Sequence, residues 1–147
     1  MRPKIIVEPL LKEPGNAFPT DYKFFVFHDR CEFVQIDIDR GTSHRRELRA
    51  PNWTPLPVTH YHTTSRVLNG PRPERFDEMR SLAEQLAAGF DHLRVDLYLI
   101  NGEIRIGEMT CYPAGGLSAI VPNEFDYRWE SYWQLTPSRR ASKVLPY

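Results

Sequence analysis

Four polar residues in the segment 94–110 (RVDLYLINGEIRIGEMT) have types and spacing that suit the binding of a divalent cation. Arg94 and Asp96 are two residues apart, and so are Glu108 and Thr110. Side chains two residues apart in a β-strand point to the same face. Each pair therefore presents its two polar side chains together if its segment is a strand.

A hairpin would bring the two pairs together. Asn101-Gly102 separates the apolar runs 92–100 and 103–110, and Asn-Gly between such runs is a strong signal for a tight hairpin turn. The two strands should therefore be antiparallel. Counted outward from the turn, Asp96 and Glu108 lie at nearly the same distance from it.

Two carboxylates on neighbouring strands repel each other unless a positive charge lies between them. Mg²⁺ is the natural cation here, because it prefers hard oxygen ligands and often bridges carboxylates to phosphates. The alternative is a polar face whose acids are simply solvated. Spacing alone leaves both interpretations open.

The pattern of this hairpin resembles the metal-binding hairpin of the ATP-grasp superfamily, to which D-alanine–D-alanine ligase and carbamoyl-phosphate synthetase belong. The two acids are twelve residues apart. The resemblance implies that Arg94 contacts phosphate and has a catalytic role, and that Asp96 and Glu108 hold Mg²⁺. Thr110 stands where most members have Asn, and its hydroxyl would complete the metal ligands.

Further motifs resemble, in order, the TupA-like ATP-grasp family, which is associated with teichuronic acid and related polysaccharide synthesis. They are PKIIVEPLL (3–11), DYKFFVFHDR (21–30), IDIDRGTSHRR (36–46), the acid hairpin and CYPAGG (111–116). The resemblance covers roughly residues 3–135. It implies ATP and Mg²⁺ as cofactors and a small carboxylate or sugar acid as substrate.

The resemblance also implies roles for single residues. Glu8 would contact adenine or ribose from a hinge strand, and Asp21 lies near the position of a ribose-binding acid. Lys23 belongs to the Asp-Tyr-Lys signature and would bind the nucleotide. Arg40 and Arg45 lie where a phosphate- or substrate-facing loop begins, Arg40 as a catalytic residue and Arg45 as a nucleotide ligand. Glu8 as a plain strand-end acid and Lys23 as an outward-facing strand lysine stay open as alternatives.

Three groups of residues outside the hairpin have interpretations of their own. The turn 113–116 (PAGG) stands where relatives have a Gly-rich turn whose amides face the reacting carboxylate. The aromatic residues Trp129 and Trp133 favour core or interface packing, although sugars also stack on such rings. Cys31 and Cys111 lack partners at metal-binding spacing, which favours buried structural thiols.

The elements that position these residues follow from periodicity and turn signals. A short strand is expected at 4–8, and the polar positions of the run 31–38 indicate one wet face. The run 31–38 and a strand at 22–28 are separated by Asp29-Arg30, which suggests a hairpin of two strands. The remaining expected elements are a long loop at 40–73 and helices at 74–89 and 123–134. This order indicates an α+β fold, an ATP-grasp C-terminal subdomain whose sheet is mostly antiparallel with helices packed on one face.

Length and charge set the outer limits. The chain has 147 residues, which suits one domain, and 19 basic residues balance 19 acidic ones. Zero net charge argues against nucleic acid or a membrane surface as a general partner, and no apolar run reaches the ~18 residues of a membrane span. Residues 1–10 do not resemble a signal peptide, so a cytoplasmic protein is expected.

The expected domain is 1–135, a C-terminal ATP-grasp subdomain without the N-terminal Gly-rich lid subdomain, followed by a tail at 136–147. We therefore expect Mg-ATP binding and ATP-dependent carboxylate activation in a ligase-type enzyme that is incomplete as an isolated chain. A complementing N-terminal subdomain is the expected partner. Two alternatives stay open: a non-catalytic nucleotide- or sugar-binding module, and a subunit that completes its site with another chain.

Overall fold

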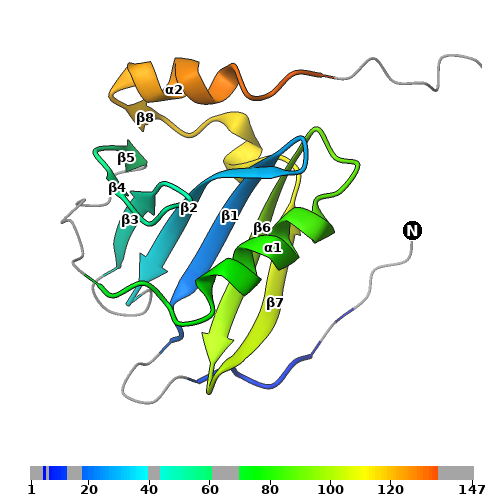
Figure 1. Ribbon diagram of the computed structural model, residues 1–147. Helices are drawn as coiled ribbons and strands as arrows, with labels where there is room; N and C mark the ends of the chain where they lie inside the picture. Colours follow the sequence, from blue (N-terminus) through cyan, green and yellow to red (C-terminus); the bar gives the residue numbers. More distant parts are fainter. Residues whose placement is uncertain (1–4, 6, 13–17, 40–43, 61–69, 136–147) are drawn as a thin grey trace, which may run out of the picture.

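The computed structural model describes residues 5, 7–12, 18–39, 44–60 and 70–135 (Figure 1). Its main sheet is antiparallel, in the spatial order β4-β3-β2-β1-β6-β7. The strands are β1 (Asp21–Phe27), β2 (Arg30–Ile38), β3 (Arg45–Arg49), β4 (Pro55–Leu56), β6 (His92–Ile100) and β7 (Glu103–Thr110). β5 (Thr59–His60) and β8 (Ile120–Val121) form a second, two-stranded sheet, and the helices are α1 (Phe76–Leu86) and α2 (Asn123–Glu130). The α+β class and the mostly antiparallel sheet are confirmed.

One face of the sheet packs against α1 and forms the larger core (Figure 1). Phe76, Met79 and Ala83 recur at three- and four-residue steps, so they share one side of α1, and all three are buried. They meet alternate residues of β1, Phe24 and Val26. This alternation leaves the other residues of β1 for the opposite face.

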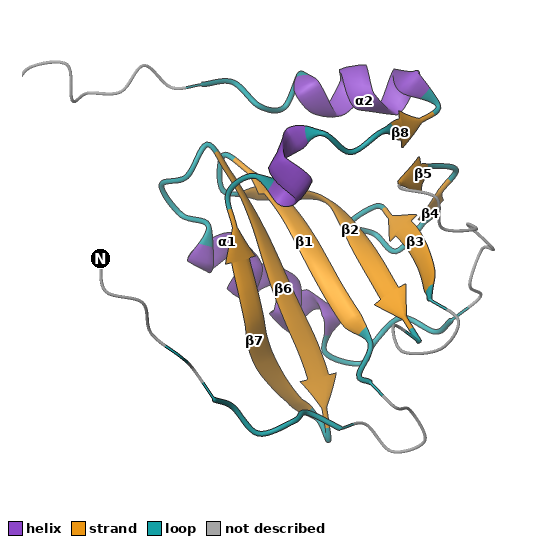
Figure 2. Ribbon diagram, turned by 180° about the vertical axis from the view of Figure 1, so that it is seen from behind, coloured by secondary structure: helices purple, strands orange, loops and turns teal. Residues whose placement is uncertain are grey.

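The opposite face is divided between an aromatic cluster and a polar region. Phe25 and Phe27 of β1 join Phe33 of β2 in a second core that α2 covers with Phe125 and Trp129. Figure 2 shows this face, with α1 behind the sheet and α2 at its upper end. The two helices therefore lie against opposite faces, not against one face as expected, because the second aromatic cluster needs its own cover.

Two expected elements are corrected by the structure. The expected strand 4–8 is absent, since the described residues 5 and 7–8 are not in a strand. The expected loop 40–73 contains β3, β4 and β5. β3 has the sequence RRELR, and its charges are accommodated within the sheet: Arg49 Nε donates to Glu47 Oε1 at 2.5 Å, and both side chains are buried.

The remaining elements agree with the sequence to within a few residues. β6 and β7 span the predicted 92–100 and 103–110, and both predicted helices are shorter than expected. Cys31 is buried, and burial raises its pKa to about 12, whereas Cys111 is exposed and the expected burial of that thiol is wrong. No helix among the described residues has the length and apolar character that a membrane crossing requires.

Candidate functional site

A pocket of about 390 Å³ lies over the polar half of the face that α1 does not cover. It is rich in charged side chains from neighbouring strands, and we call it the charged pocket. Its acidic residues are Asp21, Asp37, Asp96 and Glu108, and its basic residues are Lys23, Arg46 and Arg94. Four carboxylates against three cations leave a net charge of 4 − 3 = 1 negative unit in the lining.

Lys23 lies between two of these carboxylates. Its Nζ atom is 2.5 Å from Asp21 Oδ2 and 2.5 Å from Asp96 Oδ2. Lys23 pairs directly with Asp96 across the β1–β6 ladder, and all three side chains are buried. Burial of two carboxylates here is possible because the ammonium between them compensates their charge.

Arg94 connects the remaining residues of the predicted hairpin site. Its guanidinium donates to both oxygens of Asp96, at 2.7 and 2.8 Å. The same group reaches Glu108 Oε2 at 3.1 Å and Thr110 Oγ1 at 3.2 Å, and the Thr110 hydroxyl donates to Glu108 Oε1 at 2.7 Å. The structure therefore brings together all four polar residues that the hairpin pattern predicted.

A β-bulge at Gly107 sets the position of Glu108. Ile100 pairs with Glu103, so a regular ladder would place Gly107 opposite Asp96. Instead the register shifts, and Asp96 pairs with Glu108 while Leu97 pairs with Ile106. In a regular strand Glu108 and Ile106, two residues apart, would point to the same face. The extra residue in β7 separates them: Ile106 pairs with Leu97, whose side chain faces α1, and Glu108 lies on the polar face.

The ion pairs correct one expectation about this site. The sequence interpretation placed uncompensated repulsion between Asp96 and Glu108, to be relieved by a metal ion. In the structure Arg94 contacts both carboxylates and Lys23 contacts Asp96. The protein's own cations therefore balance these acids, and a metal ion would compete with Arg94 for their oxygens.

Asp37 and Arg46 extend the charged pocket toward β3, and the sequence interpretation missed both. Arg46 donates to the two oxygens of Asp37 at 2.6 and 3.1 Å, and Gln35 Nε2 lies 3.2 Å from each of them. Burial raises the pKa of Asp37, but the hydrogen bond and charge of Arg46, with the charge of Lys23, hold it below its usual value. The expected wet face of β2 is thus a buried, hydrogen-bonded one. The signal that could have identified these two residues is that Asp37 pairs with Arg46 across β2 and β3. This pairing can be recognised only when the register of the two strands is known.

The other predicted residues are distributed unevenly. Asp21 and Lys23 lie in the charged pocket. Arg45 Nη2 instead pairs with Asp39 Oδ2 at 2.6 Å, and Arg45 is not part of the pocket lining. Arg40 lies outside the described residues. Glu8 is exposed and lies in a different pocket.

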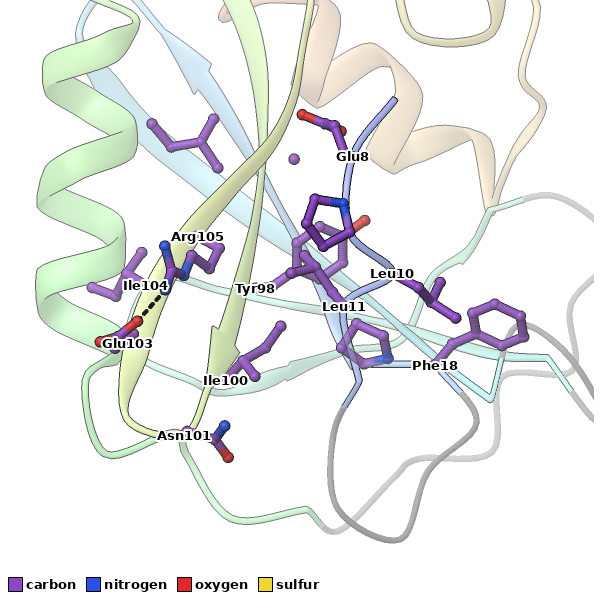
Figure 3. A pocket seen from close by; sticks show the side chains of 14 residues that line it. Glu8, Leu10, Leu11, Phe18, Tyr98, Ile100, Asn101, Glu103, Ile104 and Arg105 are labelled. Carbon is purple, nitrogen blue, oxygen red and sulfur yellow. Dashed lines mark hydrogen bonds and ion pairs between the residues drawn. The ribbon is translucent and has the colours of Figure 1, made fainter. Parts of the chain in front are cut away.

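That second pocket, the apolar edge pocket, lies between the N-terminal segment 7–11 and the β6–β7 hairpin (Figure 3). Leu10, Leu11 and Phe18 provide apolar surface, and Glu8 lies at the start of the same segment. Tyr98 and Gly107 line both this pocket and the charged pocket. The two cavities therefore adjoin.

A third cavity of about 530 Å³, the aromatic pocket, adjoins the charged pocket on its other side. Pro113 and Ser118 line both cavities. The predicted Gly-rich turn is a short 3₁₀ segment, Pro113–Gly116, in which Gly115 and Gly116 adopt positive φ angles. An apolar, a charged and an aromatic cavity thus follow one another, each sharing two lining residues with the next.

One known protein family matches most of this chain. The family model described as TupA-like ATPgrasp matches residues 1–131. The chain belongs to the TupA-like ATP-grasp family. Searches of curated proteins and of solved structures found no match. The match includes every lining residue of the apolar edge and charged pockets.

Membership of the TupA-like ATP-grasp family gives the chain a role of general ATP-grasp type, in a family that generally binds ATP and Mg²⁺. Within the described residues, no three His, Cys, Asp or Glu side chains converge as a metal site. Asp96, Glu108 and Thr110 nevertheless supply hard oxygen donors side by side. Mg²⁺ is often held by only one or two carboxylates, with water and phosphate oxygens as its other ligands. The donors therefore fit Mg²⁺ bound together with phosphate and do not fit an all-protein metal cage.

Proposed function

We propose that this chain binds Mg-ATP along the uncovered sheet face and takes part in ATP-dependent activation of a carboxylate. The observation that carries the proposal is the charged pocket, with its net negative lining and three buried or half-buried cations. A triphosphate without its metal would be repelled by the excess carboxylate. A triphosphate with Mg²⁺ finds both carboxylates for the metal and cations for its oxygens.

The order of the cavities supports one direction for the nucleotide. The adenine ring suits the apolar edge pocket, where Glu8 would contact the base or the ribose. The phosphates then lie in the charged pocket, beyond Tyr98 and Gly107. Arg94 and Lys23 would contact phosphate oxygens, and Asp96, Glu108 and Thr110 would hold Mg²⁺.

The metal would supply neutralisation of phosphate charge. The chain's residues would hold the phosphates in place, and Pro113–Gly116, beside the charged pocket, would border the carboxylate that receives the phosphoryl group. The reaction class is an ATP-grasp ligase that forms an acyl phosphate. A sugar acid of cell-surface polysaccharide synthesis is the substrate class that the family association supports.

A second ATP-grasp subdomain, in the same or another polypeptide, would complete the site in this proposal. Glu108 is 60% exposed, so the outer side of the charged pocket is open to solvent. Without that cover, water competes for the phosphates and the nucleotide binds weakly. A binding module without catalysis remains the alternative, and turnover separates the two.

The test is to trap the acyl phosphate with hydroxylamine. The chain, with and without a co-expressed ATP-grasp lid subdomain, is incubated with Mg-ATP, a uronic acid and hydroxylamine. With the lid present we expect ADP and hydroxamate in equal amounts, and without it little of either. In Arg94→Ala the rate of hydroxamate formation should fall at least tenfold (about 1.4 kcal/mol). AMP and pyrophosphate as products would contradict the acyl-phosphate route. Nucleotide binding without any product would favour the binding module.

A further inference from the structure

The guanidinium of Arg94 lies where the proposed metal ligands converge. Its Nε atom donates to Asp96 Oδ1 at 2.7 Å, and its Nη2 atom donates to Asp96 Oδ2 at 2.8 Å. The same Nη2 atom lies 3.1 Å from Glu108 Oε2 and 3.2 Å from Thr110 Oγ1. One cation of the chain therefore holds all three side chains that the proposed function assigns to Mg²⁺.

The contacts of Arg94 with Glu108 and Thr110 are weaker than those with Asp96. An Nη atom of arginine carries two hydrogens, and Nη2 faces three oxygen atoms, so at least one hydrogen is shared. Both contacts are also longer than the two with Asp96. Leaving Glu108 and Thr110 therefore costs Arg94 little, whereas leaving Asp96 breaks a two-bond ion pair.

A metal ion alone has to displace Arg94 from these oxygen atoms. The Arg94 side chain is 14% exposed, so a displaced guanidinium stays largely buried beside a new divalent charge. A buried charge without a partner is unfavourable, and two cations repel each other. Lys23 adds a further positive charge, since its Nζ lies 2.5 Å from Asp96 Oδ2. The empty site is therefore expected to bind free Mg²⁺ weakly.

A phosphate group removes this obstacle. Its oxygen atoms accept paired hydrogen bonds from a guanidinium and can ligate a metal ion at the same time. Arg94 can then exchange Asp96 for phosphate, which makes Asp96 Oδ1 available while Lys23 remains on Oδ2. Each ligand thus offsets the cost of binding the other, and the coupling free energy is the same in both directions.

We propose that Arg94 is an internal competitor of the metal ion and makes metal binding depend on a phosphate group. Without phosphate, Arg94 keeps Mg²⁺ away from Asp96 and Glu108. With phosphate, Arg94 turns to the anion and releases the two carboxylates. The inference rests on the proposed function in one respect, because it takes these carboxylates as metal ligands and the nucleotide as the source of phosphate.

Arg46 provides a matched control for the charge of Arg94. It lines the same pocket, its side chain is also 14% exposed, and it also binds both oxygens of an aspartate, Asp37, at 2.6 and 3.1 Å. Arg46→Gln makes the lining more negative by one unit, as Arg94→Gln does. It leaves Arg94 in contact with Asp96 and Glu108, so it changes the charge of the pocket without removing the competitor.

The first test uses Mn²⁺ alone, which prefers the same kinds of oxygen ligand as Mg²⁺ and whose unbound form is measured by electron paramagnetic resonance. Arg94→Gln should bind Mn²⁺ about tenfold more tightly than the parent, and Arg46→Gln should differ from the parent by less than about threefold. Adding Glu108→Gln to Arg94→Gln should abolish the gain. Equal gains in the two arginine variants, no gain in either, or a gain that survives in the double variant would overturn the inference.

Melting curves establish whether Arg94→Gln is folded. Asp96 keeps its ion pair with Lys23 in this variant, so a folded protein is expected. Mn²⁺ should raise the melting temperature of Arg94→Gln and leave that of the parent unchanged, because a ligand stabilises the state that binds it. If Arg94→Gln does not fold, Arg94→Lys replaces it. Lysine keeps the charge but lacks the planar fork, so the gain in Mn²⁺ affinity should still be about threefold, and its absence would contradict the inference.

The second test adds inorganic phosphate, with a protein-free titration to correct for Mn²⁺ bound to phosphate in solution. Phosphate should raise the Mn²⁺ affinity of the parent about fivefold or more and leave that of Arg94→Gln nearly unchanged. A parent that does not respond, or a variant that responds equally, would refute the coupling. Neither test contains ATP. Tighter Mn²⁺ binding by Arg94→Gln together with no ATP-dependent product would therefore uphold the inference and reject the proposed function.

Discussion

Lys23 and Arg94 determine the charge of the proposed site before any ligand binds. Lys23 joins Asp21 to Asp96, and Arg94 joins Asp96 to Glu108 and Thr110. Both cations contact Asp96, which is almost fully buried. The two acids of the predicted metal site therefore differ in burial: Asp96 is 2% exposed, whereas the side chain of Glu108 is 60% exposed.

This difference predicts a large stability effect for Asp96 and a small one for Glu108. Asp96→Ala removes the buried carboxylate that Lys23 and Arg94 share, and it should destabilise the chain by about 3–5 kcal/mol. Glu108→Gln alters a pair in which Glu108 is 60% exposed, so its effect should stay within about 1 kcal/mol. Urea unfolding of both variants measures this. Equal losses would show that the ion pairs around Asp96 do not stabilise the folded state.

His92 predicts how stability depends on pH. Its pKa in the folded chain is lowered from the ordinary 6.5, chiefly by burial. At pH values between the folded and the unfolded pKa of His92, the unfolded chain binds more protons than the folded chain. The contribution of His92 to folding stability is therefore complete above about pH 6.5 and is lost as the pH falls below that value. Asp37, whose folded pKa is also lowered, loses its contribution only below its ordinary value of 3.8.

The corresponding variant is His92→Gln, which cannot titrate. Its urea midpoint should decrease less than that of the parent between pH 7 and pH 5. Parallel decreases of the two proteins over this range would mean that His92 is not responsible for the loss.

Sequence periodicity predicted the elements that bury a regular face and failed where charges pair across strands. The β1–β2 and β6–β7 hairpins and α1 follow from alternation, turn residues and helical spacing. β3 was missed because its buried residues include Glu47 and Arg49, which neutralise each other only once the strand is in place. The opposite error occurred at 4–8, where β-branched residues indicated a strand but the described residues, 5 and 7–8, are not in one.

The site was predictable to the same extent. Asp96, Glu108, Arg94 and Thr110 were recognised because an Asn-Gly turn fixes a hairpin from local sequence. The bulge at Gly107 was not predicted, because counting residues outward from a turn assumes a regular ladder and cannot reveal an irregularity in it. The role of Arg46 was missed for the same reason, because its partner Asp37 is identified only by the register between β2 and β3.

The bulge gives a prediction of its own. A Cβ atom on Gly107 would lie 2.6 Å from Tyr98 Cε2, well inside van der Waals contact. Gly107→Ala should therefore destabilise the chain by about 1–3 kcal/mol. In a Tyr98→Leu background, where the ring edge is gone, the same substitution should cost clearly less. If the thermal melts give the same loss in both backgrounds, the contact with Tyr98 is not the reason for a glycine here.

At the scale of the whole molecule, three adjoining cavities with linings of different chemical character lie along one sheet. In our proposal the apolar edge pocket holds the base and the charged pocket the metal-bound triphosphate, and the aromatic pocket adjoins the charged pocket. The sheet can offer this face because α1 buries the other one and α2 covers only the aromatic end. In our proposal a second ATP-grasp subdomain covers the open side.

The most direct test of Mg-ATP binding is the Mg²⁺ dependence of affinity for a non-hydrolysable ATP analogue, measured by calorimetry. Glu78→Gln is a matched control, because Glu78 is also 60% exposed and paired with one arginine but lies on α1. The parent and Glu78→Gln should bind the analogue weakly, and more tightly as Mg²⁺ is added. Glu108→Gln should lose most of that increase and bind the metal-free analogue at least as well as the parent, since it removes one negative charge. The same Mg²⁺ dependence in all three proteins, or no binding by the parent, would contradict the proposed site.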